Sequence, residues 1–366
     1  MVNLNWDKKD LQNNLDDLNS GYSCQIKKVK KYQITQKRKQ TQLFPTKWKN
    51  KLFWGNNFEV LRFLLQECEE KIDLIYIDPP FYSGVNYELK IENGKKTYID
   101  EAYQDKWHQN LDSYLQMLYE RLFLMKKLLK DSGLMFIHLD WHASHYAKLI
   151  MDEIFGRDNF INTIIWYYYN KYSASKSNLP RAHDDILLYS KTQDYELNEV
   201  RIPREKPKKQ LKRKMVDGVL KNIKDKDGHV KYRFVKDKKL DDVWKIPCMQ
   251  PASRQWTGYP TQKHHKLLER ILKLGSNEQD LIADFFCGSG TTIYTAEKLN
   301  RRWIGTDVSQ YSIYLTKKRV LDFQKRHKND ALVHLPFEFF VEMSDEKQKI
   351  IDSGFFEKRI KIKRKK

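Results

Sequence analysis

Asp78 ends an apolar run and is followed at once by two prolines and two aromatic residues, in the stretch 77–82 (IDPPFY). The run 73–77 (DLIYI) predicts a buried strand, so the carboxylate stands at a strand end. A chain that only had to turn would more readily use Gly or Asn, whereas two prolines hold the backbone rigid. The stretch therefore indicates a fixed hydrogen-bond acceptor beside a flat apolar face. That combination suits a planar ligand that carries an amine.

A second informative stretch is residues 280–299 (DLIADFFCGSGTTIYTAEKL). A short apolar strand, 281–283, leads into Asp284, then into a Gly-Ser-Gly loop at 288–290, and then into a helix predicted from Thr291. Glycines let the backbone approach a ligand closely, and a helix N-terminus offers free N–H groups. A dinucleotide fingerprint needs a third glycine where this chain has Ile293, which disfavours a pyrophosphate site.

Asp307 lies at the end of a further predicted strand, 17 positions after Gly290. That spacing suits a carboxylate that binds the two hydroxyls of a ribose. The loop and Asp307 together predict a ligand with an adenosine-like ribose and no pyrophosphate.

The charge of the chain favours a polyanionic partner. Its 366 residues carry a formal net charge of +20, and 40% of them are hydrophobic, enough for one large domain with an insertion or for two domains. Basic residues concentrate in 24–51, in 201–240 (16 Lys/Arg against 5 Asp/Glu) and in 358–366. The segment 201–240, with Lys206, Lys208 and Lys209, is the predicted contact with the phosphates of such a partner.

Other chemical classes are disfavoured. The four cysteines, Cys24, Cys68, Cys248 and Cys287, form no C-x-x-C pair, so neither a disulfide framework nor a thiolate zinc site is expected. No apolar run approaches the roughly 18 residues that span a membrane, and the first 21 residues are too polar for a signal peptide. We therefore expect a cytoplasmic protein without a membrane partner.

Strands alternate with helices around Asp78, which predicts an α/β fold with a parallel sheet and helices on both faces. Asn56 and Asn57 predict the start of a helix over 58–70, followed by a strand over 74–77. A leucine stripe over 111–129 predicts a second helix with Gly133 as its C′ residue. A strand over 134–137 and a helix over 146–155 are expected next.

The two stretches resemble motifs of one enzyme family. Residues 78–81 resemble the D-P-P-Y/F motif of amino-methylating DNA methyltransferases, and 284–290 resemble their F-x-G-x-G loop for S-adenosylmethionine. Residues 257–263 (TGYPTQK) are similar to the segment that precedes that loop. The catalytic motif comes first and the cofactor motif later, an order similar to the β group of these enzymes. The resemblance covers roughly 50–195 and 241–325.

The resemblance implies a Rossmann-like, S-adenosylmethionine-dependent fold with circularly permuted motif order. It implies a catalytic half (50–195), a target-recognition insertion (196–240) and a cofactor-binding half (241–325). The remaining segments, which carry no such resemblance, are expected to be a basic N-terminal extension (1–49) and a basic C-terminal extension (326–366). Double-stranded DNA is the implied partner, with a homodimer or a partner restriction nuclease as further expectations.

The family's activity assigns roles to residues of this chain. Asp78 and the carbonyl of Pro79 would each accept an N–H of the target amine, the two prolines would hold these acceptors still, and Phe81 would stack on a base flipped out of the duplex. The expected catalytic residues are Asp78, Pro79, Pro80 and Phe81. The expected cofactor residues are Thr261, Lys263, Asp284, Phe286, Gly288, Gly290, Thr291 and Asp307, and Tyr82 and Ser83 are expected to contact the substrate. No metal is expected.

The chain departs from the family pattern at three positions. Phe81 stands where tyrosine is usual and keeps the stacking face, Phe285 stands where proline is usual, and His264 stands in place of the proline after T-Q-K. Asp78 favours N6-adenine methylation, because the family trend associates D-P-P with adenine and S-P-P with cytosine. The alternatives are N4-cytosine methylation, a catalytically silent DNA-binding subunit, and methylation of RNA or protein amines.

Three further segments stay open to two interpretations. The cluster His138, Asp140, His142 and His145 has the residue types of a metal site, but a structural role or a place at the substrate rim is preferred. Residues 166–172 (WYYYNKY) are either sheet core or a stacking surface beside DNA. The basic tail is either a solvated end or a nonspecific phosphate contact.

Overall fold

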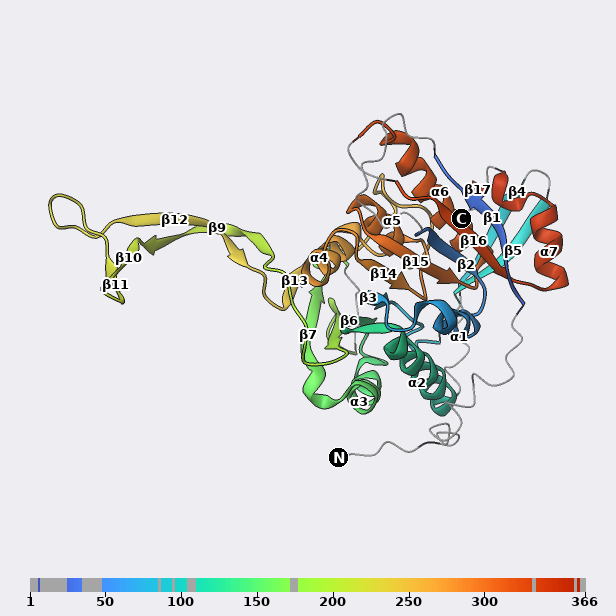
Figure 1. Ribbon diagram of the computed structural model, residues 1–366, viewed down its shortest axis with the longest axis horizontal. Coiled ribbons are helices and arrows are strands. Elements are labelled where there is room, and N and C mark those ends of the chain that lie inside the picture. Colours follow the sequence, from blue (N-terminus) through green and yellow to red (C-terminus); the bar gives the residue numbers. More distant parts are fainter. Residues whose placement is uncertain are drawn as a thin grey trace.

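The computed structural model describes residues 6, 25–34, 48–84, 87–93, 96–103, 110–171, 177–330, 334–358 and 361–362. Ten strands of these ranges form one mixed sheet (Figure 1). In spatial order they are β1 (Ile26–Tyr32), β16 (Phe337–Glu342), β2 (Asn50–Trp54), β15 (Arg302–Asp307), β14 (Leu281–Asp284), β3 (Ile72–Ile77), β6 (Leu129–Leu139), β8 (His183–Ser190), β7 (Phe160–Tyr167) and β13 (Val243–Lys245).

The strands from β16 to β6 run parallel, and β1 and β8 run antiparallel to their neighbours. Helices α1 (Asn57–Cys68), α2 (Leu111–Leu128) and α3 (Ser144–Phe155) pack with one hydrophobic core. Helices α4 (His265–Gly275), α5 (Thr291–Lys298) and α6 (Gln310–Arg326) pack with a second core across the sheet. With both faces covered, the central strands are continuous apolar runs. The α/β fold predicted from the alternating elements is confirmed.

The start of α1 follows the sequence prediction, because the Asn56 side chain accepts a hydrogen bond from the Phe58 N–H at 3.0 Å. The predicted role of Gly133 is wrong. Helix α2 passes directly into β6, and Gly133 lies inside that strand. The strand pairing is irregular between Ile72 and Leu74 at this place. A Cβ at Gly133 would lie 2.8 Å from the Lys130 carbonyl oxygen, so the position needs glycine for close backbone packing.

The two halves of the predicted methyltransferase domain share the central sheet. β14 of the second half pairs with β3 of the first, and β15 pairs with β2. The predicted N- and C-terminal extensions also contribute, through β1 and β16. Because parallel strands align their carboxyl ends, Asp78, Asp284 and Asp307 come to the same edge of the sheet.

The insertion forms a two-stranded arm that extends away from the body of the molecule (Figure 1). β9 (Arg201–Leu211) pairs with β12 (Tyr232–Lys239), and β10 (Arg213–Val216) pairs with β11 (Val219–Asn222) near the tip. The turn between β10 and β11 places Asp217 and Gly218 at φ values of 48° and 76°, as the Asp-Gly pair of a tight hairpin favours.

The remaining elements lie at the periphery. β4 (Tyr87–Asn93), β5 (Lys96–Tyr103) and β17 (Lys361–Ile362) form a separate sheet, and α7 (Asp345–Asp352) follows β16. Short 3₁₀ turns lie at Arg157–Asn159 and Phe355–Glu357. In the described ranges no helix combines the length and the apolar character needed to cross a membrane. Half of the N-terminal basic stretch 24–51 and most of the basic tail 358–366 lie outside the described residues.

Candidate active site

A cavity of about 1020 Å³ opens at the edge of the sheet where Asp78, Asp284 and Asp307 meet. Both halves of the chain line it. The predicted site residues in its wall are Asp78, Pro79, Pro80, Phe81, Ser83, Thr261, Lys263, Asp284, Phe286, Gly288, Thr291 and Asp307. The predicted catalytic and cofactor motifs are therefore walls of one cavity.

Five of the predicted site residues lie outside the cavity wall. Tyr82, with φ at 60°, packs its ring 5.4 Å from that of Tyr114 and is absent from the cavity wall. Gly290 packs against Thr316 of α6 and does not line the cavity. Lys206, Lys208 and Lys209 belong to β9 of the arm and do not line the cavity.

Asp78 lies between two basic side chains. Its Oδ2 forms an ion pair with the Lys263 ammonium, which also lies 5.2 Å from the centre of the Phe81 ring. Its Oδ1 is buried, accepts no hydrogen bond from the described residues, and lies 3.8 Å from His138 Nδ1. The backbone beside Asp78 is fixed as well, because the Tyr114 hydroxyl donates to the Pro80 carbonyl at 2.9 Å.

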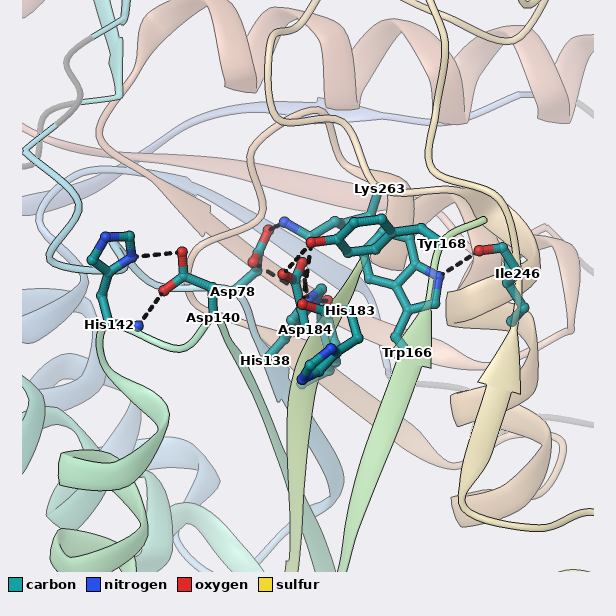
Figure 2. Close-up of polar contacts among 11 residues, drawn as sticks. Asp78, His138, Asp140, His142, Trp166, Tyr168, His183, Asp184, Ile246 and Lys263 are labelled. Carbon is teal, nitrogen blue, oxygen red and sulfur yellow. Dashed lines mark hydrogen bonds and ion pairs between the residues drawn. The ribbon is translucent and has the colours of Figure 1, made fainter. Parts of the chain in front are cut away.

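His138 is fully buried and belongs to a polar network behind Asp78 (Figure 2). Its Nδ1 lies 2.9 Å from the Tyr76 hydroxyl, and its Nε2 lies 3.3 Å from Asp184 Oδ2. The Tyr168 hydroxyl donates to Asp184 Oδ1 at 3.1 Å. Burial by itself raises the pKa of Asp184, but the hydrogen bond and charge of His138, followed by the charge of Lys263, lower this pKa below its usual value. The network thus keeps a second carboxylate ionised near Asp78.

The histidine cluster predicted from the sequence divides into two separate contacts. His138 turns to Tyr76 and Asp184, whereas Asp140 accepts from the backbone N–H of His142 at 2.9 Å and lies 2.8 Å from its ring Nδ1 (Figure 2). His145 is exposed on α3. The preferred interpretation, a structural or rim role, agrees with this arrangement.

The structure answers part of the question about residues 166–172, which were expected to be either sheet core or a stacking surface. Trp166 and Tyr168 are buried, and the Trp166 indole N–H donates to the Ile246 carbonyl at 2.8 Å (Figure 2). Tyr167 and Tyr169 alternate with them and are exposed. The strand period therefore gives the segment one core face and one solvent face.

Asp307 holds the predicted cofactor loop in place. The Gly288 N–H donates to its Oδ2 at 2.7 Å, and the Ser309 N–H donates to its Oδ1 at 2.9 Å. The Ser312 hydroxyl donates to the Gly288 carbonyl and ties the loop to α6. Asp307 thus fixes the shape of the loop while it lines the cavity.

Asp284 is buried at the base of the same loop and accepts a hydrogen bond from the Phe286 N–H at 3.0 Å. Burial raises its pKa to about 7, and the charges of Asp78 and Asp307 add to that rise, against hydrogen bonds from Thr292 and Phe286 that lower it. Three carboxyl groups near one cavity favour a cationic ligand, whose charge would relieve their mutual repulsion.

Gly290 is the N-cap residue of α5, with φ at 70°, and a Cβ there would lie 2.3 Å from Thr316 Oγ1 of α6. Its role is therefore close packing of the loop against α6. Arg319 of α6 donates to the Ser289 carbonyl at 2.6 Å, and burial lowers the pKa of this guanidinium to about 10.

The residues present fit S-adenosylmethionine, the cofactor that the motifs imply. Its sulfonium and ammonium charges match the carboxyl groups at 284 and 307, its ribose hydroxyls match a carboxylate, and its adenine ring matches the aromatic face of Phe286. Gly288 leaves room for close approach, because at φ 49° a Cβ would lie only 3.3 Å from the Tyr259 ring.

Sequence reasoning missed several residues of this cavity. Asp184 and Tyr76 were not singled out, because an Asp near the start of β8 and a Tyr inside an apolar strand carry no local motif. Lys263 was predicted as a cofactor residue, but its ammonium binds Asp78. Its neighbour Gln262 holds the segment, accepting from the Thr257 N–H at 2.7 Å.

Comparison with known families decides the class. The family model described as DNA methylase matches residues 72–318, two thirds of the chain. The chain belongs to the DNA methylase family. This confirms the predicted DNA methyltransferase class and, with it, S-adenosylmethionine as the methyl donor.

Individual relatives of this DNA methylase are distant. The Type II methyltransferase M.EcaI of Enterobacter cloacae is 29% identical over 321 residues, which cover 74% of this chain and 69% of the relative. The DNA adenine methyltransferase YhdJ of Escherichia coli is 26% identical over 289 residues, covering 79% and 89%. The solved PvuII DNA methyltransferase, titled cytosine-N4-specific, is 16% identical with a TM-score of 0.51, covering 85% and 94%, and supports the fold alone.

Proposed function

We propose that this DNA methylase transfers a methyl group to the N6 amine of an adenine flipped out of double-stranded DNA. The observation that carries the proposal is the placement of Asp78 and Phe81 in the wall of the cavity that Asp307 and Gly288 also line. An acceptor, a stacking face and a cofactor loop in one cavity match the needs of methyl transfer to an aromatic amine. The name of YhdJ, a DNA adenine methyltransferase, supports adenine as the target.

The residues of the chain would activate and position the amine. The lone pair of an aromatic amine is delocalised into its ring, so the amine is a poor nucleophile. Asp78 and the Pro79 carbonyl accept its two N–H groups and draw the nitrogen toward a tetrahedral geometry. The Lys263 ammonium forms an ion pair with Asp78 and lies near the Phe81 ring. The target amine and its base would occupy the same positions, so the substrate displaces the ammonium.

The other predicted site residues keep their roles as proposals. S-adenosylmethionine supplies an electrophilic methyl group when bound, and Phe286, Gly288 and Asp307 would hold it together with Thr261, Asp284 and Thr291. Ser83 lines the cavity and is proposed to contact the target nucleotide. Tyr82 would support Phe81 indirectly through its contact with Tyr114.

N4-cytosine methylation is the alternative that shares this chemistry. The deciding experiment incubates the protein with unmethylated bacterial DNA and S-adenosylmethionine carrying a labelled methyl group, digests the DNA to nucleosides and separates them by mass. Label in N6-methyl-2′-deoxyadenosine supports the proposal, and label in N4-methyl-2′-deoxycytidine contradicts it. Absence of label from both would favour a catalytically silent subunit.

The partners of the enzyme beyond DNA stay predictions. We keep the homodimer, the partner restriction nuclease and the cytoplasmic location as expectations. Lys206, Lys208 and Lys209 are proposed to contact DNA phosphates, because the arm that carries them is strongly basic.

A further inference from the structure

The arm leaves the body beside the candidate active site. β13, directly after the arm, pairs with β7 at the edge of the sheet, and the Ile165 N–H donates to the Asp242 carbonyl at 2.7 Å. The chain then continues to Cys248 and Gln250, which line the cavity. A duplex whose flipped base occupies the cavity therefore passes the base of the arm.

The basic charge of the arm is largely uncompensated beyond its base. Two of the acidic residues are paired near the body, where Asp237 binds Arg201 at 2.8 Å and Glu205 binds Lys245 at 2.7 Å. Asp225 accepts hydrogen bonds from its own turn. For Lys206, Lys208 and Lys209, no carboxylate of the described residues lies within ion-pair distance. Such a surface favours a polyanion and repels a second copy of a chain with net charge +20.

The arm also exposes apolar side chains that no core requires. Tyr232 and Phe234 are two positions apart on β12, so their side chains lie on the same face of the strand. They are 47% and 68% exposed. Lys209 faces Phe234 across the strands, and its ammonium lies 4.1 Å from the centre of the Tyr232 ring. At the tip, Met215 and Leu220 lie opposite each other and are 65% and 60% exposed.

A ligand for this surface must offer both phosphates and apolar edges. The groove of duplex DNA offers both, and its major groove accepts a two-stranded ribbon. A strand of the length of β9, 11 residues, extends roughly 35 Å at about 3.4 Å per residue, close to one turn of B-form DNA. The arm extends away from the body of the molecule (Figure 1), and none of residues 201–240 lines the cavity.

Resting on the proposed function, we propose that the arm lies in a groove of the duplex on one side of the target base, with contacts that continue for about one helical turn. This differs from a recognition segment that surrounds the flipped base. Lysines on the edges bind phosphates, and the Tyr232–Phe234 face together with Met215 and Leu220 contacts base edges and sugars.

The test uses the full chain, a variant in which residues 204–236 are replaced by a two-residue Gly-Ser turn, and a duplex that contains a methylated site mapped by modified-base sequencing. Hydroxyl-radical footprinting should show protection that extends about 10 bp further on one side of the target base for the full chain. The shortened variant should lose that extension and keep methyl transfer at high enzyme concentration.

Point variants keep the test independent of the deletion. Changing Lys206, Lys208 and Lys209 to Gln should reduce the slope of log affinity against log salt by up to about 2.7. Lys325→Gln in the last turn of α6, combined with Lys328→Gln just after that helix, should leave the slope unchanged. Phe234→Ser should weaken specific binding at least 5-fold and leave the salt slope unchanged. These DNA-binding measurements test the inference even if the methylated base is cytosine.

Three results would overturn the inference. They are equal footprints for the full and shortened chains, parallel salt slopes for the lysine variants, and light scattering in which the deletion converts a dimer to a monomer while the footprint is unchanged. The last result would assign the arm to a second copy. Failure of the full chain to methylate any DNA would instead count against the proposed function.

Discussion

Lys263 forms an ion pair with Asp78 although 185 residues separate them in the chain. One residue follows β3, and the other belongs to the segment that leads into α4. The contact joins the proposed catalytic motif to the proposed cofactor half of the domain. It also places the Lys263 ammonium against the Asp78 carboxylate, which we propose accepts an N–H of the target amine.

The first prediction concerns the stability of this pair. The side chains of Asp78 and Lys263 are only 15% and 13% exposed, so Lys263→Met leaves a carboxylate unpaired in a partly buried site. We expect the free energy of unfolding in urea to fall by about 1–3 kcal/mol. The double variant with Asp78→Asn should recover most of that loss. Strictly additive losses would show that the two side chains do not interact.

The second prediction concerns Asp307. Asp307→Ala removes the acceptor of two loop N–H groups and a carboxylate of the cavity wall. Affinity for S-adenosylmethionine should weaken by about 1–3 kcal/mol, the scale of charge-assisted hydrogen bonds. Asp307→Asn is the matched control and should lose less, since its amide oxygen still accepts. Calorimetry that gives wild-type affinity for Asp307→Ala would remove Asp307 from the site.

The third prediction compares two glycines of the same loop. Gly290→Ala places a methyl group 2.3 Å from Thr316 Oγ1 at φ 70°, whereas Gly288→Ala meets only the Tyr259 ring at 3.3 Å. We expect Gly290→Ala to lower unfolding stability by about 3 kcal/mol or more and Gly288→Ala by about 1–2 kcal/mol. Thermal or urea unfolding measures both. The reverse order would contradict the packing role assigned to Gly290.

The fourth prediction is a pH dependence from Asp284. Its pKa is raised from 3.8 to about 7 in the folded chain, so between these values the folded state binds more protons than the unfolded state. Stability of the enzyme without cofactor should therefore fall as pH rises from about 4 to about 7, by up to roughly 4 kcal/mol from this group. Asp284→Asn should remove that contribution. Identical pH profiles for both proteins would show that Asp284 titrates normally.

Local signals in the sequence predicted one part of the site well. Asp78 directly follows β3, and Gly288 lies in the short loop after β14, so their place at the sheet edge follows from neighbours in the chain. The start of α1 at Asn56 is equally local. These features depend on a few consecutive residues, which a sequence displays directly.

The rest depends on pairings between distant segments. Asp184 reaches His138 only because β8 runs antiparallel to β6, and no motif marks that pairing. Gly133 has the sequence pattern of a helix end, but the buried Leu129 continues the chain as a strand beside Ile72. The lysines of the insertion indicated its partner class, whereas its form as an extended ribbon became visible only in the structure.

The central claim is that Asp78 activates the target amine. Its most direct test is the single-turnover rate constant for methyl transfer, measured with enzyme in excess over a mapped DNA site and saturating S-adenosylmethionine. Asp78→Ala should lower this rate constant by about 100-fold or more, because a lost preorganised acceptor acts on the transition state. Cofactor affinity should stay largely unchanged. Asp140→Asn, a second carboxylate of the cavity wall, should stay near the wild-type rate. An Asp78→Ala enzyme that keeps more than about a tenth of the rate would contradict the account.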